Sequence, residues 1–241
     1  MNNKIITVDG PSGVGKGTIS TRIAEELGFK YLYSGSLYRS LALKLYEKNK
    51  GLEKISEDFD RLISDITIDF QYEAGKKAKV FVNNEDFTEK IRTEKVAILA
   101  SNIAKDQRAR DMLEKYQRNY LADPGLVADG RDMGTKVFRE ANIKFYLTAS
   151  VEKRAERRLN QLKDQWISAN LPNLIHKLML RDKADMERIN SPLMPAKDAV
   201  IIDTSDISVS EVFDKTINII NKRKRKIYEW RFFNFIRRKY F

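Results

Sequence analysis

Five short runs of apolar residues recur along the chain, and segments with helical spacing of apolar residues separate them. The runs span residues 5–8, 31–33, 126–128, 143–147 and 200–202. Such runs are typical of strands buried on both faces, and their alternation with helices is typical of a parallel sheet covered on both sides. We therefore expect an α/β fold with a five-stranded, parallel, doubly wound sheet.

A different pattern lies between the second and third runs, in residues 64–84. Apolar and polar residues alternate on both sides of a turn at Gly75, and the apolar positions are Ile66, Ile68, Phe70, Tyr72, Val80 and Val82. Alternation around a glycine turn predicts an antiparallel hairpin. Because the hairpin interrupts the parallel series, it belongs to an insertion.

A glycine-rich segment directly follows the first apolar run and precedes a helical pattern that ends near Leu27. The segment consists of Gly10, Pro11, Ser12, Gly13, Val14, Gly15, Lys16, Gly17 and Thr18. Glycines let backbone N–H groups turn inward around an anion, the helix N-terminus adds partial positive charge, and Lys16 supplies a full charge. The strand, loop and helix together favour a phosphate-binding P-loop over an ordinary turn.

The residue after Lys16 is Gly17, where many P-loop proteins place a hydroxyl that contacts Mg²⁺. The hydroxyl comes one position later, at Thr18, and this variant resembles the nucleoside monophosphate kinases. We therefore expect no direct protein ligand for Mg²⁺, which ATP oxygens and water would hold. Thr18 and Asp129 are the candidates for any contact, because Asp129 ends the third strand in a Walker-B arrangement. The alternative for Asp129 is a cap on the following turn.

Composition narrows the class of protein. The 241 residues are 42% hydrophobic and 33% charged, contain no cysteine, and have one histidine. These values indicate a soluble, cytoplasmic globular protein, and they exclude disulfides and thiolate chemistry. With a single histidine, a histidine-based zinc site or a Ser-His-Asp triad is not expected, and His176 is interpreted as a surface residue on a helix.

The net charge of +11 is concentrated at the C-terminus. Residues 222–241 contribute +8, and the preceding 221 residues therefore carry only +3. This basic tail also holds seven aromatic residues without a clean amphipathic stripe. Three interpretations stay open: the tail packs on the core or a partner, it contacts a membrane surface, or it binds a polyanion such as nucleic acid.

Several polar clusters follow the phosphate loop in a fixed order. They are Ser34-Gly35-Ser36-Leu37-Tyr38-Arg39, Ile91-Arg92-Thr93, Ala100-Ser101-Asn102-Ile103-Ala104, Arg108-Ala109-Arg110, Asp129-Gly130-Arg131-Asp132-Met133-Gly134-Thr135, Arg181-Asp182 with Asp185 and Arg188, and Pro192-Leu193-Met194-Pro195-Ala196. Over residues 4–220, this set resembles the bacterial cytidylate kinases, which are nucleoside monophosphate kinases.

The resemblance implies a domain organisation. Residues 1–33, 101–153 and 190–221 would form the P-loop core, and residues 34–100 the insertion that binds the nucleoside monophosphate. Residues 154–189 would form a short helical lid, and residues 222–241 lie beyond the usual end of the family. The resemblance also implies ATP-dependent phosphorylation of CMP and dCMP by direct in-line transfer, in a protein that we expect to be a monomer.

The resemblance also assigns site residues. Lys16, Arg131, Arg188 and Asp129 would be catalytic, and Arg154 and Arg158 would join the phosphate loop in binding ATP. Arg154 and Arg158 share a helix face by their spacing of four, although a solvated face paired with Glu152 and Glu156 is the alternative. The acceptor nucleotide would contact Ser34, Arg39, Ser101, Arg110, Arg131, Asp132, Arg181, Asp185 and Arg188.

Base selection would follow from hydrogen-bond polarity. Cytosine presents an amino donor beside a ring-nitrogen acceptor, and uracil reverses both. In the family, Ser101 and Asp132 face the donor, and Arg110 faces the acceptor. Mispaired buried polar groups discriminate by factors on the order of 10⁴.

Two positions depart from the family pattern: Tyr33 replaces an acidic residue, and Gln107 replaces a proline at the expected start of a helix.

Two alternatives to a cytidylate kinase stay open. They are a kinase for UMP or AMP, and a P-loop nucleotide-binding regulator that uses the tail.

Overall fold

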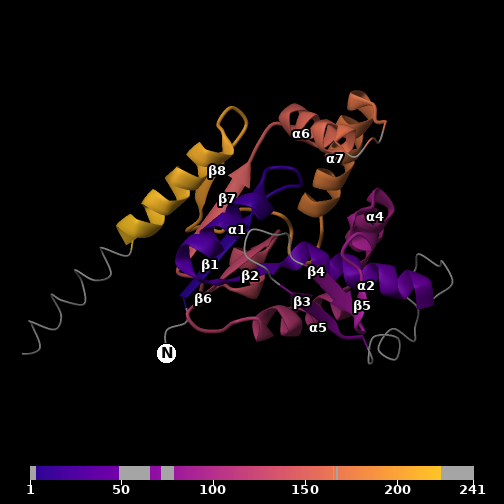
Figure 1. Ribbon diagram of the computed structural model, residues 1–241, viewed down its shortest axis with the longest axis horizontal. Coiled ribbons are helices and arrows are strands. Elements are labelled where there is room, and N and C mark those ends of the chain that lie inside the picture. Colours follow the sequence, from indigo (N-terminus) through magenta and orange to yellow (C-terminus); the bar gives the residue numbers. More distant parts are fainter. Residues whose placement is uncertain (1–3, 49–65, 72–78, 165, 167, 224–241) are drawn as a thin grey trace, which may run out of the picture.

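The computed structural model describes residues 4–48, 66–71, 79–164, 166 and 168–223. The expected hairpin turn at Gly75 and the tail from residue 224 onward lie outside the described residues. Figure 1 shows a central sheet with helices on both sides, a pair of helices at one end, and a separate group of helices and short strands at the side away from the C-terminal helix.

The central sheet contains five parallel strands in the order β2-β6-β1-β7-β8. The strands are β1 (Lys4–Asp9), β2 (Lys30–Tyr33), β6 (Gly125–Gly130), β7 (Ile143–Thr148) and β8 (Val200–Asp203). Each strand contains one of the five apolar runs, so the prediction of a five-stranded parallel sheet is confirmed. The structure extends these runs by up to three residues, because polar residues and glycines at the strand ends still pair with neighbouring strands.

Alternate residues of the sheet enter two separate hydrophobic clusters. Leu126 and Ala128 of β6 lie in one cluster with residues of α2 (Ser34–Lys48) and α5 (Gln107–Asn119). Val127 lies in the other cluster with residues of α1 (Lys16–Leu27) and of the helix at residues 209–223. Both faces of the sheet are therefore covered by helices, as the doubly wound prediction requires. No helix within the described part of the chain is long and apolar enough to cross a membrane.

The insertion contains the predicted hairpin. Strand β3 (Ile68–Gln71) pairs antiparallel with β4 (Lys79–Val82), which pairs with β5 (Glu85–Asp86). The third strand was not predicted, because two polar residues carry no periodic pattern. Its hairpin turn nevertheless has a sequence signal, since Asn83 and Asn84 both adopt positive φ, at 48° and 66°, and asparagine tolerates that region.

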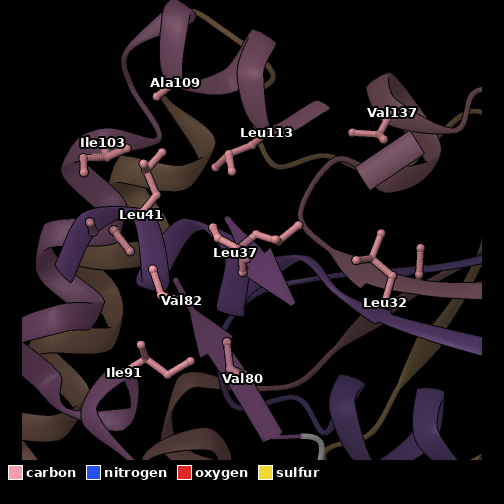
Figure 2. Close-up of a cluster of buried hydrophobic side chains, with 14 of the residues drawn as sticks. Leu32, Leu37, Leu41, Val80, Val82, Ile91, Ile103, Ala109, Leu113 and Val137 are labelled. Atoms are coloured by element: carbon pink, nitrogen blue, oxygen red, sulfur yellow. The ribbon is translucent and has the colours of Figure 1, made fainter. Parts of the chain in front are cut away.

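The insertion shares a hydrophobic core with the sheet. Figure 2 shows Leu37 and Leu41 of α2 among side chains from β4, Ile91 of η1 (Lys90–Arg92) and Leu113 of α5. The same cluster continues through α4 (Glu94–Ile103) and reaches Leu32 of β2. Helix α4 begins after Thr93, whose hydroxyl accepts a hydrogen bond from the Val96 N–H at 3.3 Å. The insertion thus shares one hydrophobic core with β1, β2 and β6.

Residues expected to form the lid make two helices with a small core of their own. Helix α6 (Val151–Lys163) and helix α7 (Leu171–Met186) pack around Ala155, Leu162 and Leu174. The Asn170 side chain accepts a hydrogen bond from the Asn173 N–H at 3.2 Å and caps α7. Helix α7 therefore begins directly after Asn170, and His176 lies exposed on that helix as predicted.

Asp9 joins the end of β1 to the turn that follows β6. Its Oδ1 accepts a hydrogen bond from the Met133 N–H at 2.9 Å, and its Oδ2 accepts one from the Gly134 N–H at 2.8 Å. Met133 and Gly134 open the short helix η2 (Met133–Val137). Burial raises the pKa of Asp9 from 3.8 to about 7, although both hydrogen bonds act in the opposite direction.

The core of the insertion predicts a stability effect. Leu41 is completely buried, so Leu41→Ala should lower the free energy of unfolding by about 2–5 kcal/mol through lost apolar contact and a residual cavity. Urea unfolding followed by circular dichroism measures it. Leu180→Ala is the control, because Leu180 is 55% exposed on α7. Equal, small losses in both variants would contradict the packing described for α2.

The raised pKa of Asp9 predicts a pH dependence of stability. The folded state binds the Asp9 proton more tightly than the unfolded state, so this contribution is full below about pH 4 and is lost as the pH rises through about 7. Relative to Asp9→Asn, the wild type should therefore lose up to about 4 kcal/mol of stability between pH 4 and pH 8. Denaturant unfolding of both proteins across this range measures the difference. A difference that stays constant or grows with pH would contradict the shift.

Candidate active site

The phosphate loop has the backbone geometry of an anion nest. Gly10, Gly13 and Gly15 have φ values of 144°, 84° and 92°, which side chains of other residues rarely tolerate. A Cβ on Gly10 would lie 2.1 Å from the Leu147 carbonyl oxygen, so only glycine fits where the loop passes β7. Helix α1 begins at Lys16 without a capping side chain. The N–H groups of its first turn are therefore available to a ligand.

Lys16 is buried at the base of this loop. Its Nζ donates a hydrogen bond to the Pro11 carbonyl oxygen at 2.8 Å. Burial, followed by the positive charge of Arg131, lowers the pKa of Lys16 well below its ordinary value, while Asp129 acts in the opposite direction. The positive charges of Lys16 and Arg131 repel one another, so an anion that binds between them is favoured.

Asp129 lies at the same edge of the sheet, in register with Val8 of β1 and Tyr33 of β2. Its Oδ2 accepts a hydrogen bond from the Tyr31 hydroxyl at 2.8 Å, and burial raises its pKa to about 6 against the opposing effect of Lys16. The cap on the turn after β6 comes from Asp9, so the capping alternative for Asp129 is not what the structure shows. Its Oδ1 is buried without a hydrogen-bond partner among the described residues.

Gly17 and Thr18 bear on how a metal would be held. A Cβ on Gly17 would lie 3.6 Å from Asp129 Oδ2, which places the glycine directly beside this carboxylate. The Thr18 side chain is exposed. Within the described ranges, no cluster of three or more acidic, histidine or cysteine side chains could hold a metal ion. Asp129, with its unpartnered oxygen, remains the candidate nearest the loop.

Asp185 of α7 holds two of the predicted arginines. Arg131 Nε donates a hydrogen bond to Asp185 Oδ2 at 2.9 Å, and Arg188 Nη1 lies 3.9 Å from Asp185 Oδ1. Burial opposes ionisation of Asp185, but Arg131 and Arg188 outweigh it and lower the pKa of Asp185. Arg188 also donates to the Ser191 carbonyl oxygen at 3.0 Å. These contacts fix both guanidinium groups from one side.

Arg181 extends from α7 to the phosphate loop. Its Nη1 is 3.4 Å from the Ser12 hydroxyl oxygen, and burial together with the charges of Arg131 and Arg39 lowers the pKa of Arg181 to about 10. Arg39 reaches this region from α2 and donates to the Ile91 carbonyl oxygen at 2.8 Å. Lys16, Arg131, Arg181 and Arg39 thus form a series of neighbouring cations.

Two arginines of the site have a buried N–H donor without a hydrogen-bond partner in the described part of the chain. These donors are Arg181 Nε and Arg188 Nε. A buried, unpaired, charged donor is costly in a folded protein. Together with the glycine nest, these donors fit a phosphorylated ligand, and the unpaired oxygen of Asp129 fits the cation that accompanies one.

Arg110 and Asp132 form a buried ion pair next to the arginine cluster. Arg110 also donates to the Ala104 carbonyl oxygen at 3.3 Å, and its guanidinium carbon lies 5.8 Å from the centroid of the Tyr38 ring. Ser101, the third residue assigned to base selection, lies in the last turn of α4. Ser34 is buried and accepts a hydrogen bond from Gln117 Nε2 at 2.9 Å.

The arginines of α6 make contacts that their spacing did not reveal. Arg154 is buried, with Nε 3.1 Å from the Ala149 carbonyl oxygen, Nη1 3.2 Å from the Ser12 carbonyl oxygen, and Nη2 2.6 Å from Asp182 Oδ2. Arg158 Nε instead donates to Glu94 Oε1 of α4 at 3.1 Å. Arg154 therefore braces the phosphate loop from outside, and Arg158 joins α6 to α4 of the insertion. Neither pairs with Glu152 or Glu156, and their contact with ATP stays a prediction.

The two departures from the family pattern have local explanations. Helix α5 begins at Gln107, and the Asp106 side chain caps it by accepting hydrogen bonds from the Arg108 and Ala109 N–H groups, so the missing proline affects only a helix start. Tyr33 turns its ring over Gly35, where an added Cβ would lie 2.8 Å from a ring carbon. The tyrosine thereby covers the first turn of α2.

Sequence reasoning did not single out Asp9, Tyr31 or Gln117. Each acts through a contact over at least 83 positions in the sequence: Asp9 with Gly134, Tyr31 with Asp129, and Gln117 with Ser34. The only signal in the chain was the position of Asp9 at the end of a buried strand, directly before the first glycine of the loop.

Comparison with known proteins agrees with this geometry. The family model described as Cytidylate kinase matches residues 6–222. A cytidylate kinase of Acinetobacter baumannii is 44% identical over 226 residues, covering 92% of this chain and 98% of the relative. A cytidylate kinase of Colwellia psychrerythraea is 43% identical over 217 residues, covering 90% and 96%, and one of a Shewanella species is 44% identical over 220 residues, covering 91% and 95%. The chain therefore belongs to the cytidylate kinase family.

Proposed function

We propose that this chain transfers the terminal phosphoryl group of ATP to CMP and dCMP, producing ADP with CDP or dCDP. The observation that carries the proposal is the continuous series of buried charges that runs from Lys16 at the phosphate loop through Arg131 to Asp185 and Arg188. One end of this series suits a nucleoside triphosphate. The other end adjoins the Arg110–Asp132 pair, which suits a base.

The phosphate loop would hold ATP. Its backbone N–H groups and Lys16 surround the β- and γ-phosphates, and Arg154 keeps the loop in shape through the Ser12 carbonyl. Magnesium, carried by ATP, would neutralise phosphate charge during transfer. The unpartnered Oδ1 of Asp129 is the group of this chain that would face its water shell.

Four arginines would hold the acceptor phosphate. Asp185 fixes Arg131 and Arg188, while Arg39 and Arg181 approach from α2 and α7. A planar guanidinium binds phosphate oxygens bidentately, so fixed arginines orient the acceptor as well as neutralise it. Their mutual repulsion when no anion is bound favours binding of one.

The transfer needs no general base from the chain. The second pKa of a nucleoside monophosphate is about 6, so its phosphate is already ionised at neutral pH. An acceptor oxygen attacks the γ-phosphorus while the bond to the ADP oxygen breaks, and no proton has to move. Lys16, Arg131 and Arg188 stabilise the charge on the transferring group by position alone.

Base selection is assigned to Asp132, Arg110 and Ser101. The Arg110–Asp132 pair presents a carboxylate and a guanidinium side by side in a buried setting, and cytosine offers the matching donor and acceptor. Uracil would place a carbonyl against the carboxylate. We also propose that residues 154–189 act as the lid and residues 34–100 as the acceptor-binding insertion, because Arg158 and Glu94 connect the two.

A panel of acceptors tests the function directly. With ATP and Mg²⁺, a coupled assay of ADP release should show kcat/KM highest for CMP and dCMP, and far lower for UMP and AMP. Preference for UMP or AMP would identify another monophosphate kinase. ATP turnover that no acceptor stimulates would favour a nucleotide-binding regulator.

Asp132→Ala should reduce kcat/KM for CMP by at least about 100-fold, because cytosine loses the acceptor for its amino group and Arg110 loses its partner. The KM for ATP should change far less. Steady-state kinetics with each substrate varied in turn measure both effects. Glu140→Ala is the control, because Glu140 pairs with Arg118 on the exposed surface. Unchanged activity on CMP in the Asp132 variant would remove the assignment.

A further inference from the structure

Asp9 has no part in the mechanism above, yet it occupies the junction of its two halves. It is the last residue of β1, directly before Gly10 of the phosphate loop, and its neighbours in the sheet are Gly130 of β6 and Tyr146 of β7. Its side chain is only 4% exposed. A buried carboxylate in that position needs partners that compensate for its desolvation.

Both carboxylate oxygens are used by one short stretch of backbone. The N–H groups of Met133 and Gly134, which bond to Asp9, follow Arg131 and Asp132 without a gap. The Asp132 carbonyl in turn accepts hydrogen bonds from Lys136 N at 2.9 Å and Val137 N at 3.2 Å. The backbone of Asp132 is therefore held between η2 on one side and Asp9 on the other.

The turn that contains Gly134 is closely packed against β1. A Cβ on Gly134 would lie 2.8 Å from Thr7 Oγ1 and 3.3 Å from Asp9 Oδ2, so the turn rests directly on β1. Thr7 is completely buried, but its hydroxyl has no hydrogen-bond partner among the described residues. Of these two polar side chains on β1, Asp9 alone therefore binds the turn.

We propose that Asp9 is a positioning residue that fixes Arg131 and Asp132 relative to the phosphate loop. The inference rests on the proposed function, because it assigns Asp9 a role in CMP selection and alignment. Asp9 touches no substrate. It couples the two nucleotide sites, because the same residue directly precedes the loop that binds ATP and holds the turn that presents the acceptor phosphate and base contacts.

A structural role alone would have a different signature. Loss of general stability reduces the amount of active enzyme and leaves the ratio between substrates unchanged. Displacement of the turn changes the placement of Asp132 and Arg131. It therefore weakens the binding of CMP more than that of ATP, and it lowers kcat/KM for CMP more than kcat/KM for UMP. The ratio of kcat/KM for CMP to that for UMP is therefore the decisive readout.

Asp9→Asn is the test variant, because the amide has nearly the shape of the carboxylate but presents an NH₂ group to one of the two N–H donors. At pH 8, where the carboxyl group is mostly ionised, kcat/KM for CMP should fall about 10- to 100-fold. The CMP-to-UMP ratio should fall at least about 10-fold, and the KM for ATP should stay within about 3-fold.

Thr7→Val is the matched control, since it changes a buried polar side chain on the same strand beneath the same glycine without removing a hydrogen bond. Its kinetics should equal those of the wild type.

If Asp9→Asn does not fold, Asp9→Glu is used, which keeps both acceptor oxygens but displaces them by one methylene group and should give the same signature. An unchanged CMP-to-UMP ratio in a folded variant, or an equal rise in KM for both substrates, would overturn the inference. Wild-type enzyme without a CMP preference would instead refute the proposed function.

Discussion

The structure depends on holding like charges close together before any substrate is present. Lys16, Arg131, Arg181 and Arg39 lie close together, and burial followed by the charge of Arg131 lowers the pKa values of Lys16 and Arg181. Such a cluster can persist only where the scaffold opposes the repulsion. Asp185 does so through Arg131 and Arg188, and the core beneath α2 and β6 keeps the elements in place. A polyanion relieves the remaining repulsion among these cations, and this relief favours its binding.

The sheet determines where these charges meet. Strands β1, β2 and β6 are parallel, and their register brings Asp9, Tyr33 and Asp129 to one edge although they are up to 120 residues apart. Ligands of open parallel sheets bind at this edge. Helix α2 of the insertion and the segment directly after α7 then bring Arg39 and Arg188 toward it. Strand order therefore brings these residues together, and no single segment contains them.

The elements that follow from local physics were predictable from the sequence. Apolar runs identified all five parallel strands, alternation identified the β3–β4 hairpin, and glycine spacing identified the phosphate loop. Strand β5 was missed because two residues carry no period, and the contacts of Arg154 and Arg158 were missed because helical spacing shows which side chains share a face but not what that face meets. The partners of Asp9, Tyr31 and Gln117 depend on tertiary contacts that no local pattern contains.

Four carboxylates near the site have four different tasks, and their partners explain the division. Asp185 has two arginines and stays ionised. Asp132 has Arg110. Asp129 accepts a hydrogen bond from Tyr31, its other oxygen has no partner among the described residues, and burial raises its pKa to about 6. In the described part of the chain, Asp9 is hydrogen-bonded by backbone N–H groups alone, and burial raises its pKa to about 7. Both oxygens of Asp9 already accept hydrogen bonds from the backbone, so Asp9 is less suited than the other three carboxylates to hold a metal ion or an arginine side chain. Its two hydrogen bonds to one turn position Asp132 and, through Arg131, the partner of Asp185.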